Sequence, residues 1–460
     1  MQIFVIGWDG ASPYLVDRWL SELPTFKRFK EEGLLGQHLP PIPAQTPVAW
    51  TTFMTGKNPG KHGVFNFLQR KKGSYERDVI YPDLIKGRTL WQILSEYGNR
   101  VGVINVPMST YKNVNGFMIP GFLDLEEGIP QPQSFKMDLE NKFGIKRLEG
   151  DLDVKTLGQV RTNPDLFWSR VEEITDLQSE IVSYLLKEEK WDFFMTVFMG
   201  IDRIHHFFWK YLDRNHPEYA ENVYTDKVRN FYKKIDDIIA RFLDIVPEDT
   251  LIILLSDHGF CFVNKELIVN NYLEEIGVAK IDRGKLDVRQ SKAVSYGYGD
   301  VWLNMKGREP NGVVEKGDYE REREKIIEFL EELKVNGEKP IKKVVKREDV
   351  YWGPYLDEAP DLVICFNPGW QAVRRVESIE KRPDKRYVID NPMWSGGHDG
   401  THDPLDVPGL LGILGPGILT KETEARNRLW DVAPTILKAK NIPIPSDMDG
   451  KPIVSFKERI

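Results

Sequence analysis

Acidic and histidine side chains follow three apolar runs of the sequence. Asp9 comes shortly after the first run, and Asp257 and His258 come directly after a later one. Asp202 and His206 follow a third run and are four residues apart, so on a helix they share one face. Each residue alone is typical of a helix cap, a turn or a plain surface. Together they form a set of carboxylate and imidazole groups that could bind a divalent metal.

Two further histidines, His398 and His402, lie in the loop Ser395–Pro404, next to Asp399 and Asp403. Glycines in this loop permit tight backbone turns around a ligand. A surface loop and a second group of metal ligands are equally compatible with this pattern. Mixed carboxylate, imidazole and hydroxyl ligands favour zinc or manganese over magnesium, which prefers all-oxygen sites.

A hydroxyl group that could act as a nucleophile stands in the sequence Gln45-Thr46-Pro47. A threonine followed by a proline predicts a helix start, with Thr46 as the N-cap and Pro47 as the first helical residue. Helix N-termini bind phosphate through free N–H groups and a partial positive charge. An aliphatic hydroxyl needs help to ionise, and a bound divalent metal supplies that help. Simple capping of the helix is the alternative role for Thr46.

Strands and helices that alternate along the chain must position these groups. Continuous apolar runs predict buried parallel strands at Ile3–Gly7, Val101–Val106, Phe193–Met199, Leu251–Ser256, Asp361–Phe366 and Leu410–Leu414. Amphipathic patterns predict helices at Leu15–Glu32, Phe167–Glu188 and Asp226–Ile245. The alternation predicts a doubly wound α/β fold with a mostly parallel sheet flanked by helices. In such sheets, functional groups gather beyond the carboxyl ends of the strands.

One long segment differs from the rest of the chain. Residues 264–395 are rich in charge, glycine and proline, and their strand signals are weaker. We expect this segment to be an inserted cap that contacts the substrate, and residues 1–263 and 396–460 to form the core. A second insertion is expected at Glu126–Asn163.

Composition narrows the class of protein. The chain of 460 residues has a net charge of -7 and only two cysteines. The acidic balance argues against binding of a nucleic acid polymer through bulk positive charge. No apolar run reaches the length of a membrane span, and the N-terminus lacks the basic segment of a signal peptide. We therefore expect a cytoplasmic protein, and the sequence leaves its oligomeric state open.

The ordered motifs resemble the alkaline phosphatase superfamily, most closely its type I phosphodiesterase/nucleotide pyrophosphatase branch and the related phosphohydrolases and phosphomutases. The residues that carry the resemblance span nearly the whole chain: Asp9-Gly10, Thr46, Thr55-Gly56-Lys57-Asn58-Pro59-Gly60-Lys61-His62-Gly63, Asp202 with His206, Asp257-His258-Gly259, His402 with Gly415-Pro416-Gly417, Asp431–Leu437 and Asp449-Gly450. Each motif alone is weakly diagnostic, whereas the ordered set is specific.

The resemblance implies two divalent metal ions, zinc or manganese, and a small-molecule phosphate ester as the substrate. It implies that one ion is bound by Asp9, Thr46, Asp257 and His258. It implies that the other is bound by Asp202, His206 and a late histidine, with His402 favoured and His398 as the alternative. It further implies that Thr46 attacks phosphorus and forms a phosphothreonine, which water then hydrolyses.

One position departs from the family pattern. Nucleotide pyrophosphatases carry an asparagine three residues after the nucleophile, where it holds a phosphate oxygen, and this chain has Ala49 there. Arg203 is the candidate that replaces it, because a guanidinium fork fits phosphate oxygens, and a structural salt bridge is the alternative.

Hydrolysis of phosphate monoesters or diesters is the implied activity. A phosphomutase on the same metals and a non-catalytic, metal-stabilised binding protein are the alternatives. A sulfatase is disfavoured, because neither Cys261 nor Cys365 lies in the Cys-x-Pro-x-Arg motif of that branch.

Overall fold

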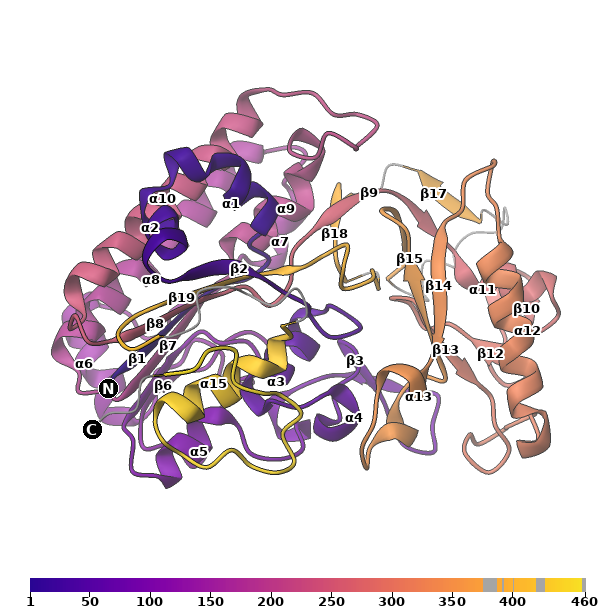
Figure 1. Ribbon diagram of the computed structural model, residues 1–460. Coiled ribbons are helices and arrows are strands. Elements are labelled where there is room, and N and C mark those ends of the chain that lie inside the picture. Colours follow the sequence, from indigo (N-terminus) through magenta and orange to yellow (C-terminus); the bar gives the residue numbers. More distant parts are fainter. Residues whose placement is uncertain (375–386, 391–392, 400, 419–426, 457–460) are drawn as a thin grey trace.

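A seven-stranded sheet forms the centre of the larger part of the molecule. The computed structural model describes residues 1–374, 387–390, 393–399, 401–418 and 427–456. The strands of the central sheet are β1 (Ile3–Trp8), β2 (Leu34–His38), β5 (Val101–Ile104), β6 (Gly116–Ile119), β7 (Phe193–Phe198), β8 (Leu251–Leu255) and β19 (Gly409–Leu414). Their spatial order is β2-β19-β8-β1-β7-β5-β6, and helices cover both faces (Figure 1). The predicted α/β fold is confirmed.

Strand direction confirms the mostly parallel sheet, with one exception. The strands from β8 to β6 in spatial order run parallel, whereas β19 is antiparallel to both of its neighbours, β8 and β2. All residues of β1, β7 and β8 are buried, and all but Thr196 are apolar or glycine. The parallel direction predicted for Leu410–Leu414 is wrong, because a short buried run carries no sign of its direction.

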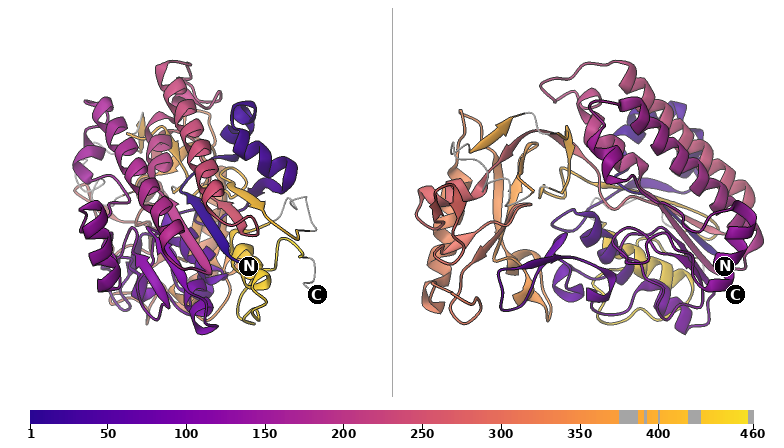
Figure 2. Two further views of the ribbon diagram at one scale, coloured as in Figure 1. Left: turned by 90° about the vertical axis from the view of Figure 1, so that its left-hand side faces the viewer. Right: turned by 180° about the vertical axis from the view of Figure 1, so that it is seen from behind.

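Two groups of helices pack on opposite faces of the sheet (Figure 2). One group comprises α1 (Pro13–Trp19), α2 (Pro24–Glu32), α8 (Pro164–Glu188), α9 (Gly200–Phe208) and α10 (Val223–Ile245). The other comprises α3 (Thr46–Thr55), α5 (Leu90–Glu96) and α15 (Val432–Ala439). The single helix predicted at Leu15–Glu32 is wrong, because α1 ends at Trp19 and a second helix begins at Pro24. Proline lacks the N–H needed inside a helix but suits its first turn.

A second, smaller unit lies beside the carboxyl edge of the central sheet (Figure 1). Strand β9 (Cys261–Leu267) leads into it. Its four-stranded antiparallel sheet has the order β12 (Ala293–Val294), β13 (Asp300–Leu303), β15 (Leu362–Phe366) and β14 (Ile341–Lys346). Helices α11 (Val269–Glu275) and α12 (Tyr319–Glu332) share its hydrophobic core. The run predicted as a parallel strand at Asp361–Phe366 is therefore a strand of this antiparallel sheet.

Short elements join the two parts. They are α4 (Pro59–His62), β3 (Leu68–Arg70), β4 (Arg77–Val79), β16 (Gly369–Ala372), β17 (Val388–Asp390) and β18 (Gly396–Gly397). Helices α6 (Gln133–Phe143) and α7 (Val154–Gly158) pack against the core instead. The β3–β4 hairpin reaches the smaller unit, where Tyr75 Oη donates to Asn304 Oδ1 (2.8 Å) and Arg77 donates to the Tyr296 carbonyl (2.9 Å). These contacts fix the smaller unit against the core.

The carboxyl ends of β1, β7 and β8 meet at one edge of the central sheet. Trp8 lies opposite Phe198 of β7, and Gly7 lies opposite Leu255 of β8. Strand β18 pairs with β9 and brings the start of the late histidine loop to the same edge (Figure 1). This is the edge at which an open parallel sheet presents its functional groups. In the described part of the chain, no helix is both long and apolar enough to cross a membrane.

Candidate active site

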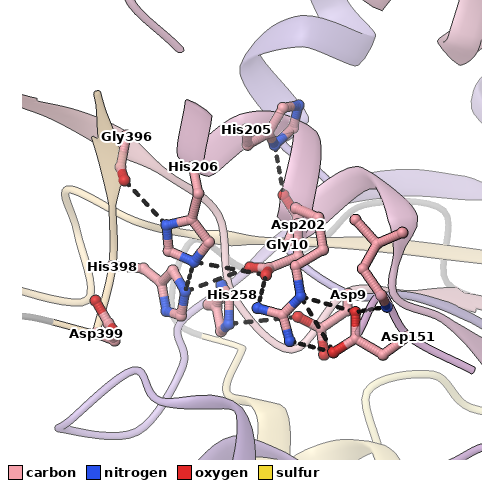
Figure 3. A network of polar contacts seen from close by, with 12 residues as sticks. Asp9, Gly10, Asp151, Asp202, His205, His206, His258, Gly396, His398 and Asp399 are labelled. Atoms are coloured by element: carbon pink, nitrogen blue, oxygen red, sulfur yellow. Dashed lines mark hydrogen bonds and ion pairs between the residues drawn. The ribbon is translucent and has the colours of Figure 1, made fainter. Parts of the chain in front are cut away.

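Two adjoining groups of acidic and histidine side chains occupy this edge (Figure 3). One group is Asp202, His206 and His398, and the other is Asp9, Asp202 and His258. Within each group, the candidate ligand atoms lie within 4.8 Å of one another. None of the five side chains is more than 2% exposed. Such a concentration of buried ionisable groups is costly unless they share a metal or pair with one another.

Two segments far apart in the sequence supply the first group. Asp202 lies in the first turn of α9, and His206 lies one turn later, with its Nε2 3.5 Å from Asp202 Oδ2. His398 follows β18 directly, and its Nε2 is 3.4 Å from Asp202 Oδ1 and 3.3 Å from His206 Nε2. The three side chains therefore point toward a common centre.

Backbone carbonyls fix the orientation of the two histidines in this group. Because a carbonyl oxygen only accepts, His206 Nδ1 donates to Gly396 (3.0 Å) and His398 Nδ1 donates to Ala44 (2.7 Å). In the neutral imidazole, this places the lone pair on Nε2, which faces the acidic centre. Metal-binding histidines commonly have this arrangement, with the second nitrogen bonded to a carbonyl.

Asp9, Asp257 and His258 complete the second group. Asp257 Oδ1 accepts a hydrogen bond from the Gly10 N–H (3.2 Å), which joins the loops after β1 and β8. His258 Nε2 is 3.1 Å from Asp257 Oδ2 and 3.8 Å from Asp9 Oδ1, but neither approach has hydrogen-bond geometry. His258 also stacks on His398, with 3.5 Å between ring centroids, so the two groups are in direct contact.

His402, the late histidine favoured from the sequence, lies outside both groups. Its Nε2 donates to the Trp370 carbonyl in the smaller unit (2.9 Å), and its backbone forms an isolated parallel β-bridge with Phe366 of β15. One ring nitrogen of His402 is therefore used in a hydrogen bond to the backbone. The geometry favours the alternative, His398. Gly400, between the two histidines, lies outside the described residues.

Several polar atoms at the centre of the site make no hydrogen bond within the described part of the chain. They are Asp9 Oδ1, Asp202 Oδ1, Asp257 Oδ2 and His258 Nε2, all fully buried. Buried polar atoms are rarely left without a partner, so each one requires an explanation. All four are oxygen or nitrogen atoms that can bind a divalent cation, and they belong to residues predicted as metal ligands. The residues present therefore fit a metal centre.

Protonation of the metal-free site follows from its crowding. Burial, reinforced by the negative charges of Asp257 and Asp202, raises the pKa of Asp9 well above its usual value. Burial also raises the pKa of Asp257 to about 8. Burial disfavours a charged imidazole at His398, but the nearby carboxylates of Asp202 and Asp399 raise its pKa to about 9. The metal-free protein thus holds protons where a cation would otherwise balance the carboxylates.

Thr46 begins helix α3 close to these groups. The N-cap predicted at Thr46 is wrong by one residue, because Gln45 is extended and its carbonyl accepts from the Ala49 N–H (2.8 Å). The segment contacts the acidic centre on three sides: Ala44 accepts from His398, Gln45 Nε2 donates to the Asp399 carbonyl (3.1 Å), and Trp50 Nε1 donates to Asp9 Oδ2 (2.8 Å). Thr46 is 4% exposed and is the first residue of α3 rather than its cap.

Arg203 makes ion pairs with two carboxylates. Its Nη1 is 3.0 Å from Asp202 Oδ2, and its Nε is 2.8 Å from Asp151 Oδ1. This is the geometry of the salt-bridge alternative rather than of a free phosphate-binding fork. Burial opposes its charge, but Asp151 and Asp202 raise its pKa above the ordinary value for arginine.

Three residues near the site were not anticipated from the sequence as parts of it. Trp50 binds Asp9, His205 Nδ1 donates to the Gly10 carbonyl (3.0 Å), and Asn66 is 8% exposed with no partner for its Oδ1. The N–H of Phe67, which follows Asn66, donates to the Gln45 side chain (3.2 Å). His205 adjoins a predicted ligand, and Asn66 follows the predicted His-Gly turn, but only the fold brings them together.

Comparison with known proteins identifies the family. The family described as type I phosphodiesterase / nucleotide pyrophosphatase matches residues 3–395. The chain therefore belongs to this family of phosphoric ester hydrolases, a branch of the alkaline phosphatase superfamily. The match ends before both late histidines and so does not choose between them. A comparison with curated proteins finds no match.

Solved structures share the fold at low sequence identity. Human ectonucleotide pyrophosphatase / phosphodiesterase 5 is 14% identical with a TM-score of 0.58, and the alignment covers 98% of this chain and 97% of that one. Phosphonoacetate hydrolase from Sinorhizobium meliloti 1021, in complex with phosphonoformate, is 17% identical with a TM-score of 0.59, covering 94% of each chain. An inactive threonine-to-alanine variant of murine ectonucleotide pyrophosphatase / phosphodiesterase 5, in complex with AMP, is 12% identical with a TM-score of 0.56. The alignment covers 99% of this chain and 100% of that one.

Proposed function

We propose that the protein hydrolyses small phosphate esters on two divalent metal ions, with Thr46 as the nucleophile. The observation that carries the proposal is the set of unpartnered ligand atoms beside the start of α3. Asp9, Asp257 and His258, together with Thr46, would hold one ion. Asp202, His206 and His398 would hold the other. When bound, the ions neutralise the buried carboxylates and stabilise an ionised hydroxyl, and zinc or manganese suits these ligands best.

The chain itself contributes orientation and an anion-binding end of a helix. The first N–H groups of α3 lack partners within the helix and carry a partial positive charge, which favours a phosphoryl oxygen beside Thr46. Asn66 lies in the same region, and its side-chain N–H group would take the phosphate-holding role for which the sequence offered Arg203. Thr46 would attack phosphorus, the ester oxygen would leave, and water would release phosphate from the phosphothreonine.

The AMP complex of the inactive murine variant, in which a threonine is replaced, supports both a nucleophilic threonine and a nucleotide-like ester as a substrate. Turnover should be measured with p-nitrophenyl phosphate and bis-p-nitrophenyl phosphate in the presence of zinc or manganese. Thr46→Ala should lower kcat by roughly three orders of magnitude or more, because it removes the attacking atom.

Thr55→Ala is the matched control, because it removes a hydroxyl of the same helix that donates to the Thr51 carbonyl (2.6 Å). Acid quenching of the wild-type protein during turnover should also trap phosphate on the peptide that contains Thr46. Unchanged turnover in Thr46→Ala would exclude this nucleophile. Transfer of phosphate within the substrate, without release of inorganic phosphate, would indicate a phosphomutase instead.

A further inference from the structure

The segment between α6 and α7 supplies a buried carboxylate to the active site. Asp151 lies in this segment, inside the insertion expected at 126–163, and its side chain is only 10% exposed. Its partner Arg203 is 14% exposed and stands next to Asp202 on α9. An insertion from one side of the sheet thus contacts the helix that carries two of the proposed ligands (Figure 3).

The guanidinium group of Arg203 bridges two carboxylates. On one side, Nε is 2.8 Å from Asp151 Oδ1 and 3.2 Å from Asp151 Oδ2, and Nη2 donates to Oδ2 as well. On the other side, Nη1 donates to Asp202 Oδ2 (3.0 Å). The planar fork of arginine is suited to this fixed, multidentate geometry, which a lysine cannot reproduce.

This bridge distinguishes the two oxygens of Asp202. Oδ2 is held by Arg203, whereas Oδ1 has no hydrogen-bond partner and lies 3.4 Å from His398 Nε2. The free oxygen therefore faces His398, and the held oxygen, which is also 3.5 Å from His206 Nε2, fixes the plane of the carboxylate.

Close packing holds the Asp151 segment in place. A Cβ atom on Gly150 would stand 2.8 Å from Asn105 Nδ2 and 2.9 Å from its Cγ, so a larger residue would force the Asn105 side chain or the segment to shift. Asn105 directly follows β5, is 2% exposed and has a left-handed backbone (φ 53°). The Leu148 N–H also donates to the Gly128 carbonyl (2.8 Å), which ties the segment to the start of the insertion.

We infer that Asp151 is a positioning residue that acts through Arg203 to fix the orientation and charge of Asp202. Asp151 shares the positive charge of Arg203, so Asp202 keeps enough negative charge to bind a cation. It also prevents Arg203 from turning toward the substrate. This inference deepens the proposed function and depends on Asp202 being a metal ligand. Partners that orient a ligand in this way commonly change metal affinity by about 10- to 100-fold.

The test is zinc affinity, measured by chelator competition on the full-length protein, together with kcat and KM. Asp151→Asn should weaken zinc binding about 10- to 100-fold and lower kcat, with KM changed much less. Arg203→Ala should show a loss of similar size. If Asp151 acts only through Arg203, the double variant should be no worse than Arg203→Ala alone.

Glu149→Ala is the matched control, because Glu149 lies two residues away in the same segment and pairs with Arg170 on the surface (2.8 Å). It should leave zinc affinity unchanged. Gly150→Ala keeps every charge but displaces the segment, so it should weaken zinc binding in the same direction as Asp151→Asn. This variant tests the inference even if Asp151→Asn fails to fold.

Two results would overturn the inference. Additive losses in the double variant would show that Asp151 does not act through Arg203. A raised KM with unchanged zinc affinity in Arg203→Ala would make Arg203 a substrate-binding residue instead. Failure of the nucleophile assignment is separate, because it appears as retained turnover in Thr46→Ala and does not change the zinc affinities compared here.

Discussion

Replacing the two late histidines separately should give different zinc affinities: His398→Ala should bind zinc more weakly, and His402→Ala should bind it almost unchanged. His398→Ala removes a nitrogen that lies 3.3 Å from His206 Nε2 and 3.4 Å from Asp202 Oδ1. His402→Ala removes a nitrogen that donates to the Trp370 carbonyl (2.9 Å). The first change takes away a proposed ligand, whereas the second takes away a hydrogen bond between the late loop and the smaller unit.

The size of the difference follows from the number of ligands. Structural zinc sites with four protein ligands have apparent binding free energies of about 10–16 kcal/mol, which is about 3 kcal/mol for each ligand. Because about 1.4 kcal/mol is a factor of ten, His398→Ala should weaken zinc binding about 100-fold. His402→Ala should lower the free energy of unfolding by about 1–3 kcal/mol, because the buried Trp370 carbonyl loses its donor. Its zinc affinity should change by less than about threefold.

Zinc affinity is measured by competition with a chromogenic chelator after metal removal and reloading. Urea unfolding of the metal-free variants gives the free energy of unfolding in parallel and shows that both proteins are folded. The reasoning is refuted if His402→Ala loses zinc while His398→Ala retains it. Equal losses in both variants would also contradict it, because His402 lies outside both groups of candidate ligands.

Two further predictions concern the same site. Because the pKa of His398 is raised to about 9, its contribution to the stability of the metal-free protein is complete below about pH 6.5 and is lost as the pH rises through 9. The raised pKa of Asp257, about 8, acts in the same direction, so the urea midpoint of the metal-free protein should fall between pH 6.5 and 9 while zinc affinity rises. A flat or opposite pH dependence of both quantities would contradict the assignment. Trp50→Phe removes the N–H that donates to Asp9 Oδ2 (2.8 Å), so it should lower the free energy of unfolding by about 1–3 kcal/mol and zinc affinity about tenfold, as measured by urea unfolding and chelator competition. An unchanged urea midpoint and zinc affinity in that variant would show that this hydrogen bond does not matter.

The central sheet could be predicted because its strands are buried on both faces. The run 3–7 has no charged or strongly polar residue and the run 193–199 has only Thr196, which is typical of strands covered by helices on both faces. The strands of the smaller unit were harder to assign, because β12 has two residues and β13 has four. Strands of that length are shorter than the window over which periodicity carries information.

Local spacing determined only part of the site. Asp202 and His206 share a face of α9 because helical geometry brings residues four apart together. The choice between His398 and His402 depends on the path of a loop, and His402 is drawn toward the smaller unit by the Trp370 carbonyl. Asp151 and Arg203 are separated in the sequence by the long helix α8, so no local pattern predicts their contact.

The most direct test of the proposed metal centre is a crystal structure of the protein grown with zinc, with anomalous scattering used to locate the metal. The account predicts two zinc ions at the carboxyl edge of the central sheet. It places Thr46 Oγ1, Asp9, Asp257 and His258 around one ion, and Asp202, His206 and His398 around the other. Zinc bound by His402 in place of His398, or zinc with Thr46 outside its coordination sphere, would contradict the account.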